Sequence, residues 1–204
     1  MTAIYALALA AFLPAAGTIP RQELPAPSPV LVEFLVRVAD YVEVRREVAA
    51  GMGGPVFCSD PEELTRQAAD LAGAIRNARP LAREGTIFTP RVAVFLRARI
   101  AHTVRVAALD VTTSVGDDDV VLDVHALLPW GAGRRAWPVL VEALPVLPQE
   151  LEYRFVGRHL VLLDAEANLV VDVLRDALPE DVPGATIRSN GSCDVHPELP
   201  ACWM

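Results

Sequence analysis

The sequence predicts an α+β protein, mainly α: a bundle of three long amphipathic helices, with shorter helices, that carries a C-terminal three-stranded antiparallel meander. Two observations lead to this fold class. Apolar residues recur with helical spacing in three segments between residues 30 and 107. From residue 151 the spacing changes to two, which is typical of half-buried strands. The composition, 52% hydrophobic and 22% charged, is that of a globular domain.

The residues before this domain have the pattern of an export signal: 1–17 form a predicted signal peptide and 18–29 a Pro-rich spacer. Ile4 to Leu13 is an unbroken apolar run, which as a helix spans about 15 Å, too short for a bilayer core of roughly 30 Å. Because the first basic residue, Arg21, follows the run, an apolar helix packed on the domain is the alternative. We expect a periplasmic or secreted protein, membrane-anchored if the signal is not cleaved.

The three long helices are marked by their ends. The first begins after Pro29 and stops before the glycine-rich segment 51–55. The second runs from an N-cap at Asp60 to Pro80, and the third starts from an N-cap at Thr89. Short connections favour an up-down-up arrangement. The expected buried stripes are Leu31, Phe34, Leu35, Val38, Tyr41 and Val42; Leu64, Ala68, Leu71, Ile75 and Ala78; and Val92, Leu96, Ile100, Val104 and Ala107.

The segment from 110 to 150 has weaker patterns. Residues 112–119 are polar and turn-like, and 120–128 fit either a short helix or a strand. Residues 138–144 are expected to form one or two helical turns. The following stretch, 144–148, is an extended apolar strap, because each of its prolines disfavours helix in the residue before it.

The meander comes last. Its predicted strands are 152–156, 159–163 and 169–173, joined by turns at 157–158 and 164–168. One face of this sheet is expected to lie on the helices. The globular domain then covers residues 30–178, and residues 179–204, rich in Pro and Gly, form an irregular tail.

Charge excludes some classes of partner. The net charge is −8, and all 18 basic residues are arginines spread over the chain, which argues against nucleic-acid binding. No second long apolar run follows the N-terminal one, so no further membrane span is expected.

Two parts of the chain resemble a known family. Residues 83–90 carry one motif, and residues 147–158, followed by Leu160, Asp164, Ala167–Asn168 and Val171–Asp172, carry the other. Over roughly residues 30–175 the chain resembles a family of uncharacterised exported bacterial proteins with no assigned activity. The resemblance implies export and a shared fold, and it assigns no catalytic residue.

The cysteines suggest one covalent link. Cys193 and Cys202 lie close together in the tail, and a disulfide between them is favoured in an oxidising compartment. Free thiols are one alternative. A zinc site that adds His196 and Asp194 is another, but its spacing fits no established zinc motif. Cys58 is left without a partner in this scheme.

Two clusters of charged residues remain. Residues 117–119, with Asp123 and His125, could ligate Ca²⁺, but the EF-hand spacing is absent and a solvated turn is favoured. An arginine group at the end of the second helix could bind an anion, but pairing with carboxylates and with the helix dipole is favoured. Its members are Arg76, Arg79 and Arg83. His102 is expected at the edge of the third helix. No cofactor or metal site is expected.

Compact catalytic motifs are missing from the sequence. There is no HExxH or GxSxG pattern, and the absence of lysine excludes a P-loop. We therefore expect a non-catalytic binding or interaction domain with an unidentified envelope or protein partner. The alternative is an exported, hydrolase-like enzyme whose site combines residues distant in sequence. A polar cleft with perturbed pKa values would favour the enzyme, and an exposed apolar patch the binding domain.

Overall fold

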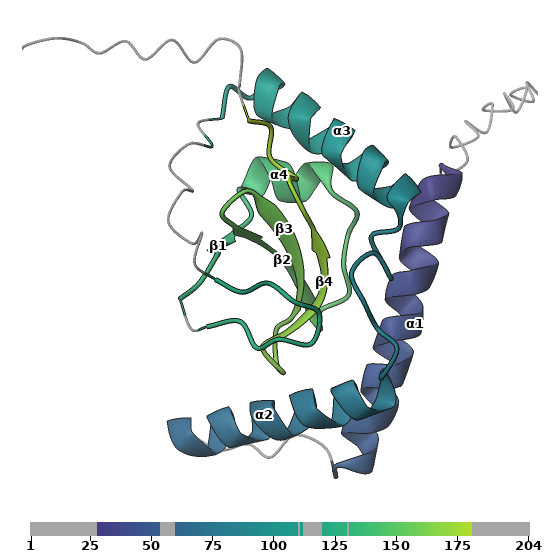
Figure 1. The fold of residues 1–204 in the computed structure, drawn as a ribbon, viewed down its shortest axis with the longest axis vertical. Coiled ribbons are helices and arrows are strands. Elements are labelled where there is room, and N and C mark those ends of the chain that lie inside the picture. Colours follow the sequence, from purple (N-terminus) through teal and green to yellow (C-terminus); the bar gives the residue numbers. More distant parts are fainter. Residues whose placement is uncertain (1–27, 54–59, 110, 112–119, 130, 181–204) are drawn as a thin grey trace, which may run out of the picture.

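The computed structural model describes residues 28–53, 60–109, 111, 120–129 and 131–180. These residues confirm the expected fold class, α+β and mainly α, with an antiparallel sheet at the C-terminal side (Figure 1). The helices are α1 (Pro29–Gly51), α2 (Pro61–Ala78), α3 (Pro90–Val106) and α4 (Pro138–Ala143). The strands are β1 (Arg134–Arg135), β2 (Leu151–Val156), β3 (His159–Asp164) and β4 (Leu169–Leu174).

The predicted helix starts are confirmed by their caps. The side chain of Asp60 accepts a hydrogen bond of 3.1 Å from the backbone N–H of Glu62 at the start of α2. Thr89 Oγ1 accepts one of 3.5 Å from Val92 N–H at the start of α3. In both helices a proline occupies the first position, where no backbone donor is needed.

The long helices are not arranged as the expected up-down-up row. α1 contacts both α2 and α3, which lie near its opposite ends, so the three helices bracket the sheet (Figure 1). Their apolar stripes and one face of the sheet form a single core. Leu64, expected in the buried stripe of α2, is exposed in the first turn of the helix.

The sheet has the strand order β1-β2-β3-β4, with every neighbouring pair antiparallel. The three predicted strands match β2, β3 and β4 to within one residue at each end. A register shift between Leu162 and Leu163 interrupts the pairing of β3 with β4. β1 was not predicted, because two residues are too short to show a periodic pattern.

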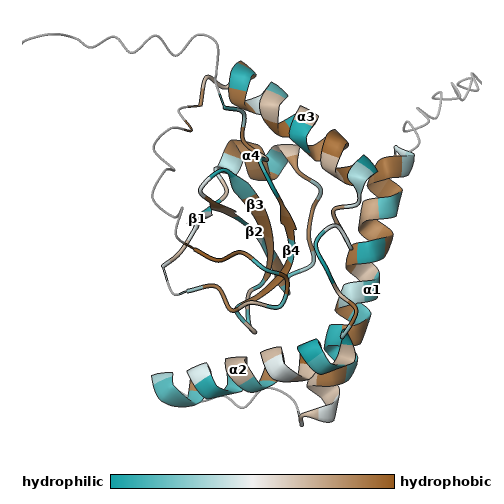
Figure 2. Ribbon diagram, in the orientation of Figure 1, coloured by the Kyte–Doolittle hydropathy of each residue, from teal (hydrophilic) through white to brown (hydrophobic). Residues whose placement is uncertain are grey.

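Both faces of the sheet are covered. Phe155, Leu160 and Leu169 join the core formed by the helices. Val161, Val173 and their neighbours on the opposite face pack against a second cluster that includes Leu122, Leu128 and Ala132. Strands buried on both faces have few polar positions, as the hydropathy colouring of β3 and β4 shows (Figure 2).

The segment 120–128 is neither the helix nor the strand that its pattern allowed. It is irregular and covers the second face of the sheet, with one isolated antiparallel bridge between Leu127 and Leu169. The predicted turns at 138–144 form α4. The strap is not helical: Leu144 is extended, and residues 145–148 have no regular secondary structure. The hydroxyl of Tyr153 donates a hydrogen bond of 3.1 Å to the carbonyl of Pro145.

Several predicted segments lie outside the described residues: the signal peptide, nearly all of the spacer and the tail, and the turn at 112–119. Within the described ranges, no helix is long and apolar enough to cross a membrane.

Candidate functional site

Asp164, the last residue of β3, is completely buried and links α1 to the sheet. One carboxylate oxygen accepts hydrogen bonds from Tyr41 Oη at 2.7 Å and Arg45 Nε at 3.3 Å. The other accepts the backbone N–H of Ala167 at 2.9 Å. Arg45 also pairs with Glu166 in the turn after β3. A buried carboxylate with these partners is compensated, so it fixes α1 against the sheet.

Asp172 on β4 is a second completely buried carboxylate. It accepts hydrogen bonds from the backbone N–H groups of Gly85 at 2.9 Å, Ile87 at 2.6 Å and Phe88 at 2.8 Å, and from that of Val173 at 2.8 Å. Three of these donors belong to the loop between α2 and α3. The carboxylate therefore replaces the backbone partners that an irregular loop lacks.

This contact joins the two segments that carry the family resemblance, 83–90 and the end of 147–172. Gly85 has a φ of +80°, a conformation that glycine adopts without steric cost, and it turns the loop toward the carboxylate. Burial raises the pKa of Asp172, and the four backbone donors oppose that rise.

The two groups with strongly raised pKa values, Tyr41 and Tyr153, have structural roles. Burial raises the pKa of Tyr41 well above its usual range, and the negative charge of Asp164 adds to the effect. Burial likewise raises the pKa of Tyr153. Both hydroxyls donate hydrogen bonds to acceptors within the protein. They stabilise the fold and present no reactive group at a cleft.

The arginine group at the end of α2 does not pair with carboxylates among the described residues. Arg76 Nε donates a hydrogen bond of 2.8 Å to the carbonyl of His125. The guanidinium of Arg79 lies over the ring of Tyr41, 4.7 Å from its centroid, and its Nη1 is buried without a hydrogen-bond partner. Burial lowers the pKa of Arg79. Arg83 is exposed.

His125 lies beside this arginine group. Its φ is +72°, and its backbone N–H donates to the carbonyl of Val170 at 2.8 Å. Its Nε2 is buried and has no hydrogen-bond partner. Burial lowers the pKa of His125, and the charges of Arg79 and Arg76 lower it further.

The structure does not assemble the predicted acidic cluster into a metal site within its described part. Asp123 is exposed, and residues 117–119 are outside the described ranges. The described residues contain no group of three or more His, Cys, Asp or Glu placed to hold a metal ion. His102 is exposed on α3. Further candidates lie outside the described residues: Cys58, Cys193, Asp194, His196 and Cys202.

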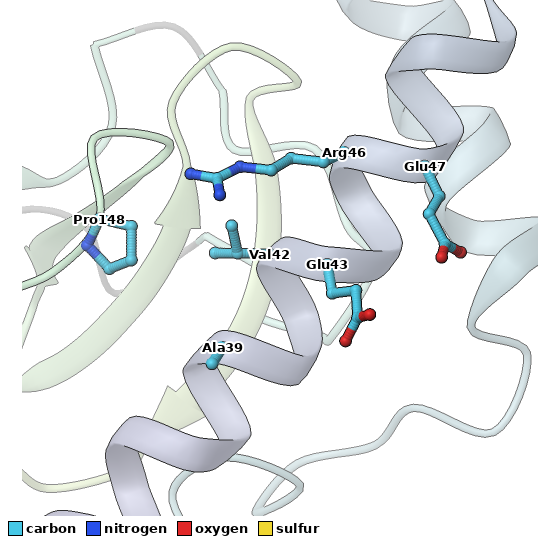
Figure 3. A pocket seen from close by; sticks show the side chains of 6 residues that line it. All are labelled: Ala39, Val42, Glu43, Arg46, Glu47 and Pro148. Carbon is cyan, nitrogen blue, oxygen red and sulfur yellow. The ribbon is translucent and has the colours of Figure 1, made fainter.

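A groove of about 480 Å³ lies on α1 next to the strap (Figure 3). Val42 and Arg46 point toward Pro148, whereas Glu43 and Glu47, which also line the groove, point away from Pro148. Ala39 completes the lining. Arg46 is anchored by Glu150 just beyond the strap, with Nε and Oε1 2.7 Å apart.

The groove continues an exposed apolar surface on α1. We call Val32, Leu35, Val36 and Ala39 the outer stripe, because they lie on the solvent side with spacing of three, one and three residues. The side chains of Val36, Val32 and Leu35 are 53%, 43% and 40% exposed. Leu35, expected in the buried stripe, thus belongs to the outer one.

Comparisons with protein-family models, with curated proteins and with solved structures find no match to this chain. The fold and the site define an α+β domain in which Asp164 and Asp172 are internal polar anchors and α1 exposes an apolar stripe.

Proposed function

We propose that the protein is an exported, non-catalytic domain that binds a protein partner in the cell envelope through the outer stripe and the groove of α1. The observation that carries the proposal is the outer stripe of α1, in which Val32, Leu35 and Val36 are exposed next to one another. A soluble domain normally covers such a helix face with polar side chains. Contiguous exposed apolar residues are typical of interaction surfaces.

The groove supports binding rather than catalysis. Its lining consists of apolar and charged side chains, which a partner can contact by packing and by ion pairing. Tyr41 and Tyr153, whose pKa values are strongly raised, do not line the groove. The strap adds Val146, which is 88% exposed, two residues before Pro148. Each apolar side chain that a partner covers contributes about 25 cal/mol per Å² of buried surface.

The chemistry of the surface defines the partner. Ala39 and Pro148 offer apolar contacts, while Glu43 and Glu47 add negative charge at the side of the helix. Because Arg46 is already paired with Glu150, the surface favours a positive group on the partner. The segment of the partner that fits this surface carries apolar side chains and at least one Lys or Arg.

Export is supported by the uncharged apolar run at residues 4–13 and the Pro-rich spacer after it. The resemblance to exported bacterial proteins agrees with this placement.

Site-specific photo-crosslinking in intact cells tests the binding surface. A photoreactive residue at Val36 should give one defined crosslinked product, and the same residue at Val94 on α3, which is 68% exposed, is the matched control. Val36→Asp should leave the melting temperature unchanged and abolish a crosslink made from position 39. Equal products from positions 36 and 94, or a crosslink at 39 that survives Val36→Asp, would refute the proposal.

A further inference from the structure

We propose that Arg76, Arg79 and His125 form a binding site for a small oxyanion, a phosphate or carboxylate group, where the end of α2 meets α1 and the segment that covers the second face of the sheet. This site is separate from the α1 surface, so the inference does not depend on the proposed function.

Two buried nitrogen atoms in this cluster have no hydrogen-bond partner. Arg79 Nη1 is a donor, and His125 Nε2 donates when it carries the imidazole proton. Arg79 Nη1 and His125 Nε2 are shielded from solvent, and neither is hydrogen-bonded in the structure. Folded proteins satisfy nearly all of their buried polar atoms, since an unsatisfied one keeps the full cost of desolvation. Two such atoms in one cationic cluster indicate the place of a missing acceptor.

The protein supplies no anion of its own to this cluster within the described ranges. The negative charge of Asp172 favours the charged form of Arg79. The carboxylate oxygens of Asp172, however, already accept hydrogen bonds from four backbone N–H groups. Asp164 is likewise engaged by Tyr41 and Arg45. Among the described residues, no carboxylate forms an ion pair with Arg76 or Arg79.

The charge balance favours an anion despite the nearby helix end. The C-terminal end of a helix carries about half a negative charge, which would repel an oxyanion. Arg76 and Arg79 bring two full positive charges to the last turn and the C-cap of α2. Burial lowers the pKa of His125, and the charges of Arg79 and Arg76 lower it further.

The site is also held in place. The Tyr41 ring lies under the Arg79 guanidinium, and the Tyr41 hydroxyl is fixed by Asp164. Arg76 is tied to the backbone of His125. Donors that are positioned before the ligand arrives lose little entropy on binding. Two single nitrogen atoms lack partners, so the ligand group that binds them is small.

Thermal unfolding with inorganic phosphate and with acetate tests the inference, with sodium chloride at the same ionic strength as the reference. We expect a saturable rise in melting temperature with phosphate, acetate or both, and the stronger of the two identifies the ligand class. The imidazole resonances of His125 should shift with the same midpoint. Responses equal to that of chloride for both anions would overturn the proposal.

Variants make the test specific. Arg79→Gln should weaken the apparent affinity at least tenfold, because a charged donor is lost. His125→Asn should weaken it less, and asparagine tolerates the left-handed backbone at this position. Arg105→Gln, at an exposed position on α3, removes the same charge and should leave the affinity unchanged. If Arg79→Gln does not fold, the His125 resonances of the unmodified protein decide. Equal affinity losses in Arg79→Gln and Arg105→Gln would show that the anion responds only to the net charge of the protein, and would refute the site.

Discussion

At the scale of single residues, two aspartates hold the fold together from inside. Asp164 receives side chains of α1, and Asp172 receives the backbone of the loop between α2 and α3. Neither role could be predicted from the sequence. The partners Tyr41 and Asp164 are 123 positions apart, and no local pattern marks a carboxylate whose acceptor sites are filled by distant donors. The resemblance included both aspartates without assigning them a role.

Replacing Asp172 tests its structural role. Asp172→Asn keeps one acceptor oxygen but places an amide donor against backbone N–H groups, so we expect a loss of about 2–3 kcal/mol in the free energy of unfolding. Urea denaturation measures it. Asp123→Asn, at an exposed position, is the control and should change stability by less than about 0.5 kcal/mol. Equal effects of the two substitutions would contradict the role given to Asp172.

His125 predicts a pH dependence of stability. Burial, Arg79 and Arg76 lower its pKa in the folded state. The unfolded chain, with a histidine pKa near 6.5, therefore binds the proton first as the pH falls. The contribution of neutral His125 to the free energy of unfolding is complete above about pH 6.5. It is lost as the pH falls through the lower pKa that His125 has in the folded protein. Melting temperatures between pH 8 and 4.5 should thus fall less steeply for His125→Asn than for the unmodified protein.

The matched control for this profile is His102→Asn, because His102 is exposed on α3. It should reproduce the profile of the unmodified protein. A profile of His125→Asn that runs parallel to both would show that His125 is not involved.

At the scale of elements, the sequence predicted what short-range patterns determine. Caps at Asp60 and Thr89 and alternation from residue 151 located the long helices and the meander. The bracket of helices, the cover formed by 120–129 with Ala132, and the strand β1 depend on contacts between distant segments, which periodicity does not encode. Leu35 was misplaced for the same reason, since a helix with two apolar faces shows one continuous pattern.

A substitution at Gly133 tests how closely the chain before β1 approaches β2. The φ of Gly133 is +71°, and an added Cβ would come within 2.8 Å of Val156 Cγ2 and 3.1 Å of the Phe155 carbonyl oxygen. Gly133→Ala should therefore cost about 2–3 kcal/mol in unfolding free energy, from backbone strain and crowding together. Differential scanning calorimetry provides the measurement.

Gly51→Ala is the control for this substitution, because a Cβ at the end of α1 meets no atom within 4 Å. It should leave the protein unchanged or stabilise it by up to about 1 kcal/mol. If Gly133→Ala were equally harmless, the close approach of β1 would not exist in solution.

At the scale of the whole molecule, the proposed export predicts where the mature chain begins. If residues 1–17 are a signal peptide, mass spectrometry of protein from the periplasm or medium should find an N-terminus near Thr18. Replacing Leu9 with Arg should interrupt the apolar run and leave the chain in the cytosol. An intact Met1 in a cytosolic fraction of the unmodified protein would exclude export.

The tail makes a separate prediction about the mature molecule. A Cys193–Cys202 bridge closes a loop of ten residues, worth about 2.7 kcal/mol by chain entropy, and it acts on the tail alone. Cys193→Ser should leave the melting temperature of the domain nearly unchanged and make the tail more sensitive to protease. Thiol titration of denatured, unreduced protein should find one free thiol, and three would exclude the bridge.

The position of α1 in the chain has a consequence for the order of folding. Its polar contacts with β3 span more than a hundred residues, whereas each meander strand pairs with the next one along the chain. Contacts that close small loops form first, so the hairpins assemble before α1 docks. During synthesis at about 5–20 residues per second, α1 waits on the order of ten seconds for Asp164 to emerge. Throughout that interval both apolar faces of the first helix are open to whatever receives the nascent chain.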